Sequence, residues 1–399
     1  MEDTVRPVLP VVMPEDPVNG KNERLESVLE SALRGTRPVW LCTPEETENY
    51  FRAHRPKKGE EYRPVLFAAG LGEDGVNTGL TGLFRLLRGD QGLLEGYAGG
   101  VIADGMSDLY TKSAARELVF TANCAGCAFV GRPLVEATRT LSNFTISAQI
   151  LSTDELTAYH QCAAVLVQEI LSFRRNGPGN AAHFLSSREE ERGEEMPGTL
   201  PADGRRPNLL VLHASLRKTS NTLALWHRTA EYLRDDLDIR EISLQNGTLY
   251  DCAGCPYHTC LHYGERGSCF YGGIMAESVY PAVRRANGLV MICANYNDAL
   301  SANLTAFINR LTALFRQVRF YDKALFAIVV SGYSGSDIIA EQLISALNMN
   351  KTFYLPAHFC MMETANNAGQ ALKLPGIEVR IREFADRIRS TLCAEKCPP

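Results

Sequence analysis

Five short apolar runs divide the second half of the chain, and segments with apolar residues at helical spacing lie between them. The runs are residues 209–212, 239–244, 289–293, 324–330 and 353–360. Continuous apolar runs of this length are typical of strands buried on both faces, which occur in parallel sheets. The alternation of strands and helices predicts an α/β fold with a doubly wound, parallel, five-stranded sheet in a domain of residues 208–392.

The first half of the chain carries a second alternating pattern. Residues 1–20 are rich in proline and acid and are predicted to form an extended arm. Apolar residues at helical spacing predict an amphipathic helix over residues 22–33, and strands then alternate with helices up to about Phe173. These patterns predict an α/β domain over residues 21–173, a charged flexible linker over 174–207 and a short tail over 393–399.

An internal similarity links the two predicted domains. Residues 64–80 resemble residues 208–223, because both have an apolar strand, a polar loop and an Asn-Thr pair before a helix. Two further matches follow in the same order, at residues 100–118 with 288–307 and at 131–138 with 322–329. The order favours duplication over the general likeness of α/β units. Because the first copy has Glu73 and Asp74 in its loop, we expect a degenerate domain without a phosphate ligand.

A hydroxyl-rich, basic loop follows the first strand of the second domain. It contains Arg217 and Lys218 and leads into a helix that begins near Leu223. Unpaired N–H groups and the helix dipole make a helix start suitable for an anion. Side chains that could add donors to phosphate oxygens are Ser215, Thr219, Ser220, Asn221 and Thr222. An ordinary capped turn is the alternative.

Two more polar loops, residues 295–301 and 331–337, follow the third and fourth predicted strands. Open α/β sheets bind ligands at the ends of such strands, so we expect the three loops to meet. Tyr296 and Tyr333 are suited to covering a planar ring, and Gly332 and Gly335 allow close approach of the backbone.

These motifs resemble those of flavodoxin-like NAD(P)H-dependent FMN reductases, over residues 208–392. The resemblance implies that FMN is the cofactor and that NAD(P)H is the electron donor. It implies that the FMN phosphate is held by Ser215, Arg217, Ser220, Asn221 and Thr222. It further implies that the isoalloxazine is flanked by Asn295, Tyr296, Asn297, Asp298, Ser331, Gly332, Tyr333, Ser334 and Gly335.

A cysteine-rich segment follows the second strand of the same domain. Cys252, Cys255, Cys260 and Cys269 have the spacing C-x2-C-x4-C-x8-C. Four thiolates within such a span can bind an iron–sulfur cluster or zinc, and they can also remain plain thiols. The first alternative resembles the iron–sulfur flavoprotein branch of the family, with a 4Fe–4S cluster expected near the flavin.

Composition excludes several other classes of protein. A net charge of −5 argues against a general nucleic-acid binder, and no apolar run approaches the roughly 20 residues that span a bilayer. Twelve cysteines without a signal-peptide pattern indicate a reducing compartment, so we expect a cytoplasmic protein.

The sequence therefore predicts an FMN-dependent oxidoreductase that passes electrons from NAD(P)H to an unidentified acceptor. The flavin would carry the chemistry, so no side chain is assigned a catalytic role. The alternatives are an iron–sulfur flavoprotein electron carrier and a non-catalytic flavodoxin-like binding or sensing protein. The family resemblance also implies a homo-oligomer, or an internal pseudo-dimer built by the duplicated domains.

Overall fold

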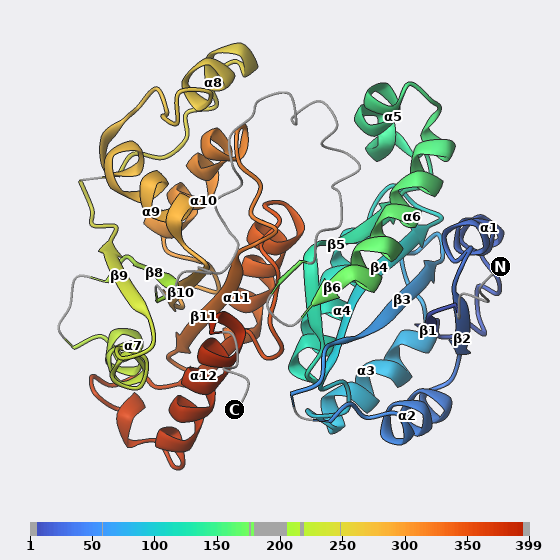
Figure 1. Cartoon of the computed structure of the whole chain (residues 1–399), viewed down its shortest axis with the longest axis horizontal. Coiled ribbons are helices and arrows are strands. Elements are labelled where there is room, and N and C mark those ends of the chain that lie inside the picture. The colour runs from blue at the N-terminus through green and yellow to red at the C-terminus, as the bar shows by residue number, and fades with distance from the viewer. Residues whose placement is uncertain are drawn as a thin grey trace. The chain divides into compact units, whose positions relative to one another are not determined.

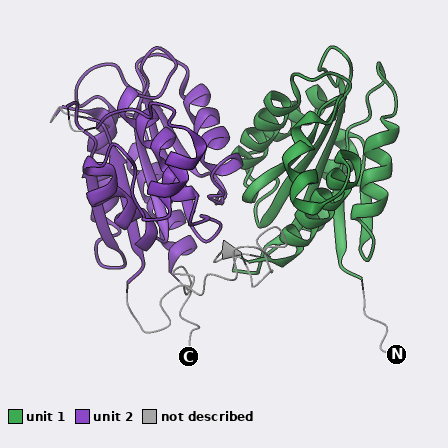
Figure 2. Ribbon diagram, turned by 90° about the horizontal axis from the view of Figure 1, so that it is seen from above, with its two compact units in different colours: residues 1–193 green, residues 194–399 purple. Residues whose placement is uncertain are grey.

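The chain divides into two compact units, Met1–Gly193 (unit 1) and Glu194–Pro399 (unit 2), which Figure 2 colours separately. The structure is a computed structural model, and it describes residues 6–57, 59–174, 177–178, 206–215, 219–247 and 249–393. The predicted linker (174–207) and tail (393–399) lie almost wholly outside the described residues, so those two boundaries stay predictions.

Unit 2 contains the predicted five-stranded parallel sheet. Its strands are β8 (Asn208–His213), β9 (Asp238–Ser243), β10 (Gly288–Ala294), β11 (Ala324–Ser331) and β12 (Cys360–Thr364). They lie in the order β9-β8-β10-β11-β12, and every neighbouring pair is parallel. Numbered within the unit this order is 2-1-3-4-5, which is the order of a flavodoxin-like sheet. The predicted fold class is confirmed.

Helices cover both faces of this sheet (Figure 1). They are α7 (Asn221–Glu231), α8 (Tyr257–Gly264), α9 (Tyr280–Arg285), α10 (Ala302–Phe315), α11 (Ser336–Leu343) and α12 (Ile377–Leu392). α7 and α12 pack against each other over β10 and β11, while α8 packs on α10. The central strands β10 and β11 are buried almost throughout, which explains their continuous apolar sequence.

The fifth strand begins later in the chain than predicted. The apolar run at residues 353–360 is buried, but its backbone is irregular: Thr352 and His358 have positive φ angles and Pro356 lies between them. The strand β12 is the half-buried segment that follows it. The apolar sequence of residues 353–360 therefore indicates that the segment is buried, not that it forms a strand.

Unit 1 has the same strand order. Its strands are β1 (Val8–Val12), β2 (Arg37–Leu41), β3 (Arg63–Leu71), β4 (Tyr97–Gly105) and β5 (Ala128–Ala137). Its helices are α1 (Glu23–Ala32), α2 (Pro44–Ala53), α3 (Gly79–Gly89), α4 (Thr111–Cys124), α5 (Thr145–Leu151) and α6 (Glu155–Ser172), and a short antiparallel pair, β6 (Phe173–Arg174) and β7 (Gly177–Pro178), follows. The sheet is parallel and ordered β2-β1-β3-β4-β5, again 2-1-3-4-5.

The extended arm predicted for residues 1–20 is wrong for the part that forms β1. This strand is buried between β2 and β3, although Pro10 lies at its centre. Proline has no N–H to donate, and β1 pairs with β3 only through Val11 and Val12, after the proline. The helix predicted over residues 22–33 is present as α1, with Asn22 capping its start.

The equal strand orders support two units of one topology, but the sequence matches are out of register. Residues 64–80 contain β3, the third strand of unit 1, whereas residues 208–223 contain β8, the first strand of unit 2. In the common order β8 corresponds to β1. The predicted alignment of the loops is therefore wrong.

Candidate functional site

Five loops leave the carboxyl edge of the unit 2 sheet, by which we mean the edge where its parallel strands end, and four of them form the candidate site. We name them after the preceding strands: the β8 loop (214–220), the β10 loop (295–301), the β11 loop (332–335) and the β12 loop (365–371). The strand order reverses at β8, which lies between β9 and β10. Ligands of open α/β sheets bind outside the carboxyl ends of the strands at such a reversal.

The β8 loop ends in the capped start of α7. Ser220 is the N-cap, and its Oγ accepts a hydrogen bond from the Leu223 N–H at 3.4 Å. The Ser220 and Thr222 hydroxyls lie 2.8 Å apart, while Thr219 is exposed. Arg217, the predicted cation of this loop, lies outside the described residues. The described part of the loop therefore presents hydroxyls at a helix start.

The β10 loop is a tight two-residue turn. Tyr296 and Ala299 exchange backbone hydrogen bonds of 3.2 and 3.1 Å across Asn297 and Asp298. Both central residues have left-handed backbone angles, φ 53° and 58°, which asparagine and aspartate tolerate better than most residues. The turn leaves the Tyr296 ring 55% exposed at the carboxyl edge.

Asn295 connects the β10 loop to the β11 loop. Its amide donates to Asp298 Oδ1, Ser331 Oγ and the Ser334 carbonyl at 3.0–3.1 Å. Gly335 completes this junction at a φ of 88°, and a Cβ there would lie 2.1 Å from Asp298 Oδ1. Tyr333 projects beside the junction with 81% of its surface exposed.

The β12 loop joins the site, and the sequence did not indicate it. The Asn366 amide donates to the Tyr333 hydroxyl at 2.9 Å, and Gln370 accepts from the Asn366 and Asn367 N–H groups. The Asn221 side chain also bonds to this loop. It donates to the Ala365 and Asn367 carbonyls and accepts from the Ala371 N–H. The misplaced fifth strand hid these residues, because its predicted end fell at residue 360.

A charged cluster lies behind the β8 loop, between α7 and β9. Glu241 accepts from Trp226 Nε1 at 3.0 Å and faces His213 Nε2 at 3.2 Å and His227 Nε2 at 3.4 Å. The hydrogen bond with His213 outweighs partial burial and, with the nearby His227, lowers the pKa of Glu241 to about 2. The cluster therefore fixes α7, and with it the helix start, against the edge of the sheet.

The metal-binding role of the four cysteines stays a prediction. In the part of the chain that the structure describes, no three His, Cys, Asp or Glu side chains are arranged to hold a metal, and this covers Cys252, Cys255, Cys260 and Cys269. The loop after β9 leads to this segment, and the residues just before Cys252 pack beside the second half of α10. Asp251 bonds to Asn309, and Arg310 bonds to the Tyr250 carbonyl, in the second half of α10. At 1.5 Å per residue this is about 12 Å along the helix from its start.

The corresponding edge of unit 1 is closed by its own loops. The Asp16 carboxylate accepts from Thr78 and Asn19, and the Asn19 amide also donates to the Val76 carbonyl. Burial raises the pKa of Asp16, but these hydrogen bonds outweigh it and hold that pKa below its ordinary value. The charged carboxylate stands in the loop after β1, which is the counterpart of the β8 loop, and would repel a phosphate.

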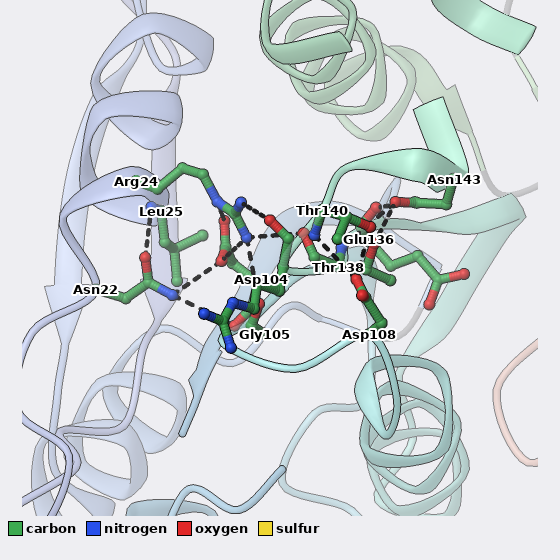
Figure 3. A network of polar contacts seen from close by, with 11 residues as sticks. Asn22, Arg24, Leu25, Asp104, Gly105, Asp108, Glu136, Thr138, Thr140 and Asn143 are labelled. Carbon is green, nitrogen blue, oxygen red and sulfur yellow. Dashed lines mark hydrogen bonds and ion pairs between the residues drawn. The ribbon is translucent and has the colours of Figure 1, made fainter. Parts of the chain in front are cut away.

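A buried ion pair holds the neighbouring strands of unit 1 (Figure 3). Arg24 donates to both oxygens of Asp104, at 2.8 and 2.9 Å, and Asn22 donates to the same carboxylate at 2.9 Å. Arg24 also donates to the Thr138 carbonyl beyond β5. Asp104 is fully buried, so these contacts occupy the carboxyl edge of unit 1 at β4.

A cavity of about 510 Å³ lies at the opposite edge of unit 2. Arg284 and Arg285 line it at the end of α9, two residues before β10 begins, together with Arg266 just beyond α8. Cations at helix ends compensate the negative end of the helix dipole. Because its lining residues lie where β10 begins, the cavity is at the amino edge of the sheet and is separate from the four loops.

The topology defines unit 2 as a flavodoxin-like α/β domain, and the four loops form a candidate ligand site at its carboxyl edge. The sequence model of a family described as NADPH-dependent FMN reductase matches residues 207–367. The C-terminal half of the chain therefore contains an NADPH-dependent FMN reductase domain, as the loop motifs predicted.

Several solved structures resemble about half of the chain at low identity. An NAD(P)H:quinone oxidoreductase from Methanothermobacter marburgensis is 14% identical, covers 47% of this chain and 98% of its own, and has a TM-score of 0.34. An FMN-dependent NADH-azoreductase from Bacillus anthracis, solved in complex with FMN, is 12% identical; the match covers 46% of this chain and 99% of the azoreductase, with a TM-score of 0.31. The NADH:FMN oxidoreductase EMOB is 16% identical; the match covers 48% of this chain and 92% of EMOB, with a TM-score of 0.34. Curated proteins gave no match.

No helix in the described ranges is both long enough and apolar enough to cross a membrane.

Proposed function

We propose that the chain is an FMN-dependent oxidoreductase that takes electrons from NAD(P)H and passes them to an acceptor. The observation that carries this proposal is the meeting of four polar loops at the strand-order reversal of unit 2. The family match over residues 207–367 supports FMN as the cofactor.

The residues of the β8 loop fit the phosphate end of FMN. Ser220 lies at the start of an eleven-residue helix, where its hydroxyl contacts that of the buried Thr222, and Thr219 beside it is exposed. Ser215 lies at the start of the same loop. The helix dipole and the unpaired N–H groups there favour an anion. Arg217 keeps its predicted role as the cation of this loop.

The β10 and β11 loops fit the ring end. Large aromatic side chains are usually buried, yet Tyr296 and Tyr333 are mostly exposed on neighbouring loops. Their rings are available to pack on a planar group, and the glycine at 335 keeps the two loops in close contact. FMN, when bound, supplies the hydride and electron-transfer chemistry, and the chain binds and orients it.

We further propose that each chain holds one FMN, in unit 2. The corresponding loops of unit 1 are tied together by Asp16, Asn19 and Asn22, and carry acid where a phosphate would need donors. Unit 1 would have to break these contacts to admit a ligand.

Anaerobic mixing of the FMN-loaded full chain with NADPH or NADH tests the function. The proposal expects rapid loss of the visible absorbance of the oxidised flavin and its return when an acceptor such as a quinone is added. Tight FMN binding without reduction by either nicotinamide would favour the non-catalytic alternative. Failure to bind FMN would overturn the proposal.

A further inference from the structure

The side chain of Asn221 faces the β12 loop, although it is the first residue of α7, next to the N-cap. Its amide donates to the Ala365 carbonyl at 3.1 Å and to the Asn367 carbonyl at 2.9 Å. Its Oδ1 accepts from the Ala371 N–H at 3.2 Å. An asparagine amide has two donor hydrogens, so both are used within the protein.

The same β12 loop holds the ring end of the site. Asn366 lies between the two carbonyls that Asn221 binds, and its amide donates to the Tyr333 hydroxyl. The Gln370 side chain accepts from the N–H groups of Asn366 and Asn367 and so keeps this part of the loop compact. The backbone of the β12 loop and its hydrogen bonds therefore connect the start of α7 to the exposed Tyr333.

We infer that Asn221 is a positioning residue that couples the phosphate end of the flavin site to its ring end through the β12 loop. The inference rests on the proposed function and differs from the role that the sequence motif implies, direct contact with the phosphate. Losing Asn221 would release the β12 loop from α7 and leave the Ala371 N–H, which belongs to a fully buried residue, without its partner. Tyr333 would then lose the support that fixes its hydroxyl.

Riboflavin separates the two roles, because it carries the same ring as FMN but lacks the phosphate. Direct contact predicts that Asn221→Ala weakens the binding of FMN and leaves that of riboflavin unchanged. Positioning predicts that both ligands bind more weakly by a similar factor, about tenfold for the loss of one to two hydrogen bonds.

The experiment measures the dissociation constants of FMN and riboflavin for the flavin-free full chain, by quenching of flavin fluorescence. Asn221→Ala is compared with Asn350→Ala, a control whose amide donates only to the Ser345 carbonyl. The same pair is repeated in a Tyr333→Phe background, which keeps the ring and removes the hydroxyl that Asn366 binds.

The inference expects equal weakening for both flavins in Asn221→Ala, no change in Asn350→Ala, and a smaller effect of Asn221→Ala when Tyr333 is already phenylalanine. An effect confined to FMN, or equal effects in both backgrounds, would overturn it. If the wild-type chain binds neither flavin, the proposed function itself fails, and the two failures are thereby distinguished.

Discussion

Gly335 is the position where the structure predicts the sharpest effect on the flavin site. It has a φ of 88°, and a Cβ would lie 2.1 Å from Asp298 Oδ1 and 2.8 Å from Asn295 Nδ2. Real Cβ atoms do not approach neighbours this closely, so Gly335→Ala must displace the Asp298 side chain and disturb the bond that joins it to Asn295.

The magnitude follows from two contributions. A left-handed backbone costs alanine about 1 kcal/mol relative to glycine, and loss of the Asn295–Asp298 hydrogen bond costs about 1 kcal/mol more. We therefore expect Gly335→Ala to lower the free energy of unfolding of unit 2 by about 2 kcal/mol. The dissociation constant of FMN should rise at least about tenfold, because both loops that flank the ring move.

Gly247→Ala is the matched control. Its φ is 82°, but no atom lies within 4 Å of the added Cβ, so it has the backbone strain without the collision. Urea unfolding and FMN titration of the two variants separate the contributions. Equal losses of stability and unchanged FMN affinity in both variants would refute the proposed packing of the β10 and β11 loops.

Three further outcomes follow from the structure. Arg24→Ala leaves Asp104 buried without its cation and should destabilise unit 1 by about 3 kcal/mol, with FMN binding unchanged. Arg88→Ala removes one partner of an exposed ion pair and should destabilise unit 1 by less than about 1 kcal/mol, and thermal unfolding measures both effects. The pKa of Glu241 is lowered from 4.5 to about 2, so its charge stabilises the fold above about pH 4.5, and this contribution disappears as the pH falls towards 2. In urea unfolding, Glu241→Gln should therefore be less stable than wild type at pH 6, and the two stabilities should converge at low pH. Replacement of the four cysteines of residues 252–269 by serine should leave FMN affinity unchanged in an FMN titration, because the residues that lead into them bond to the second half of α10.

The fold of unit 2 could be predicted because its central strands are buried on both faces. β8, β10 and β11 have continuous apolar sequences, and no loop packing is needed to recognise them. β1 was missed because Pro10 weakens its strand signal, and β12 because a buried irregular segment before it is more apolar than the strand itself.

The candidate site could be predicted as a set of loops but not as a set of contacts. Tyr296, Tyr333 and Gly335 lie where the motif placed them, and the role of each in binding FMN stays a prediction. The partners of Asn221 lie 144–150 residues away in sequence, and no local pattern reveals such contacts. The metal role of the four cysteines also stays a prediction, because no group of three ligating side chains is arranged there among the described residues.

The number of FMN molecules bound by each full-length chain tests the central claim most directly. The flavin-free protein is titrated with FMN, flavin fluorescence is followed, and the chain concentration is determined independently. The hydroxyls at the start of α7 in unit 2 and the Asp16 carboxylate in the corresponding loop of unit 1 predict saturation at one FMN per chain. Saturation at two, or no binding at all, would contradict the account.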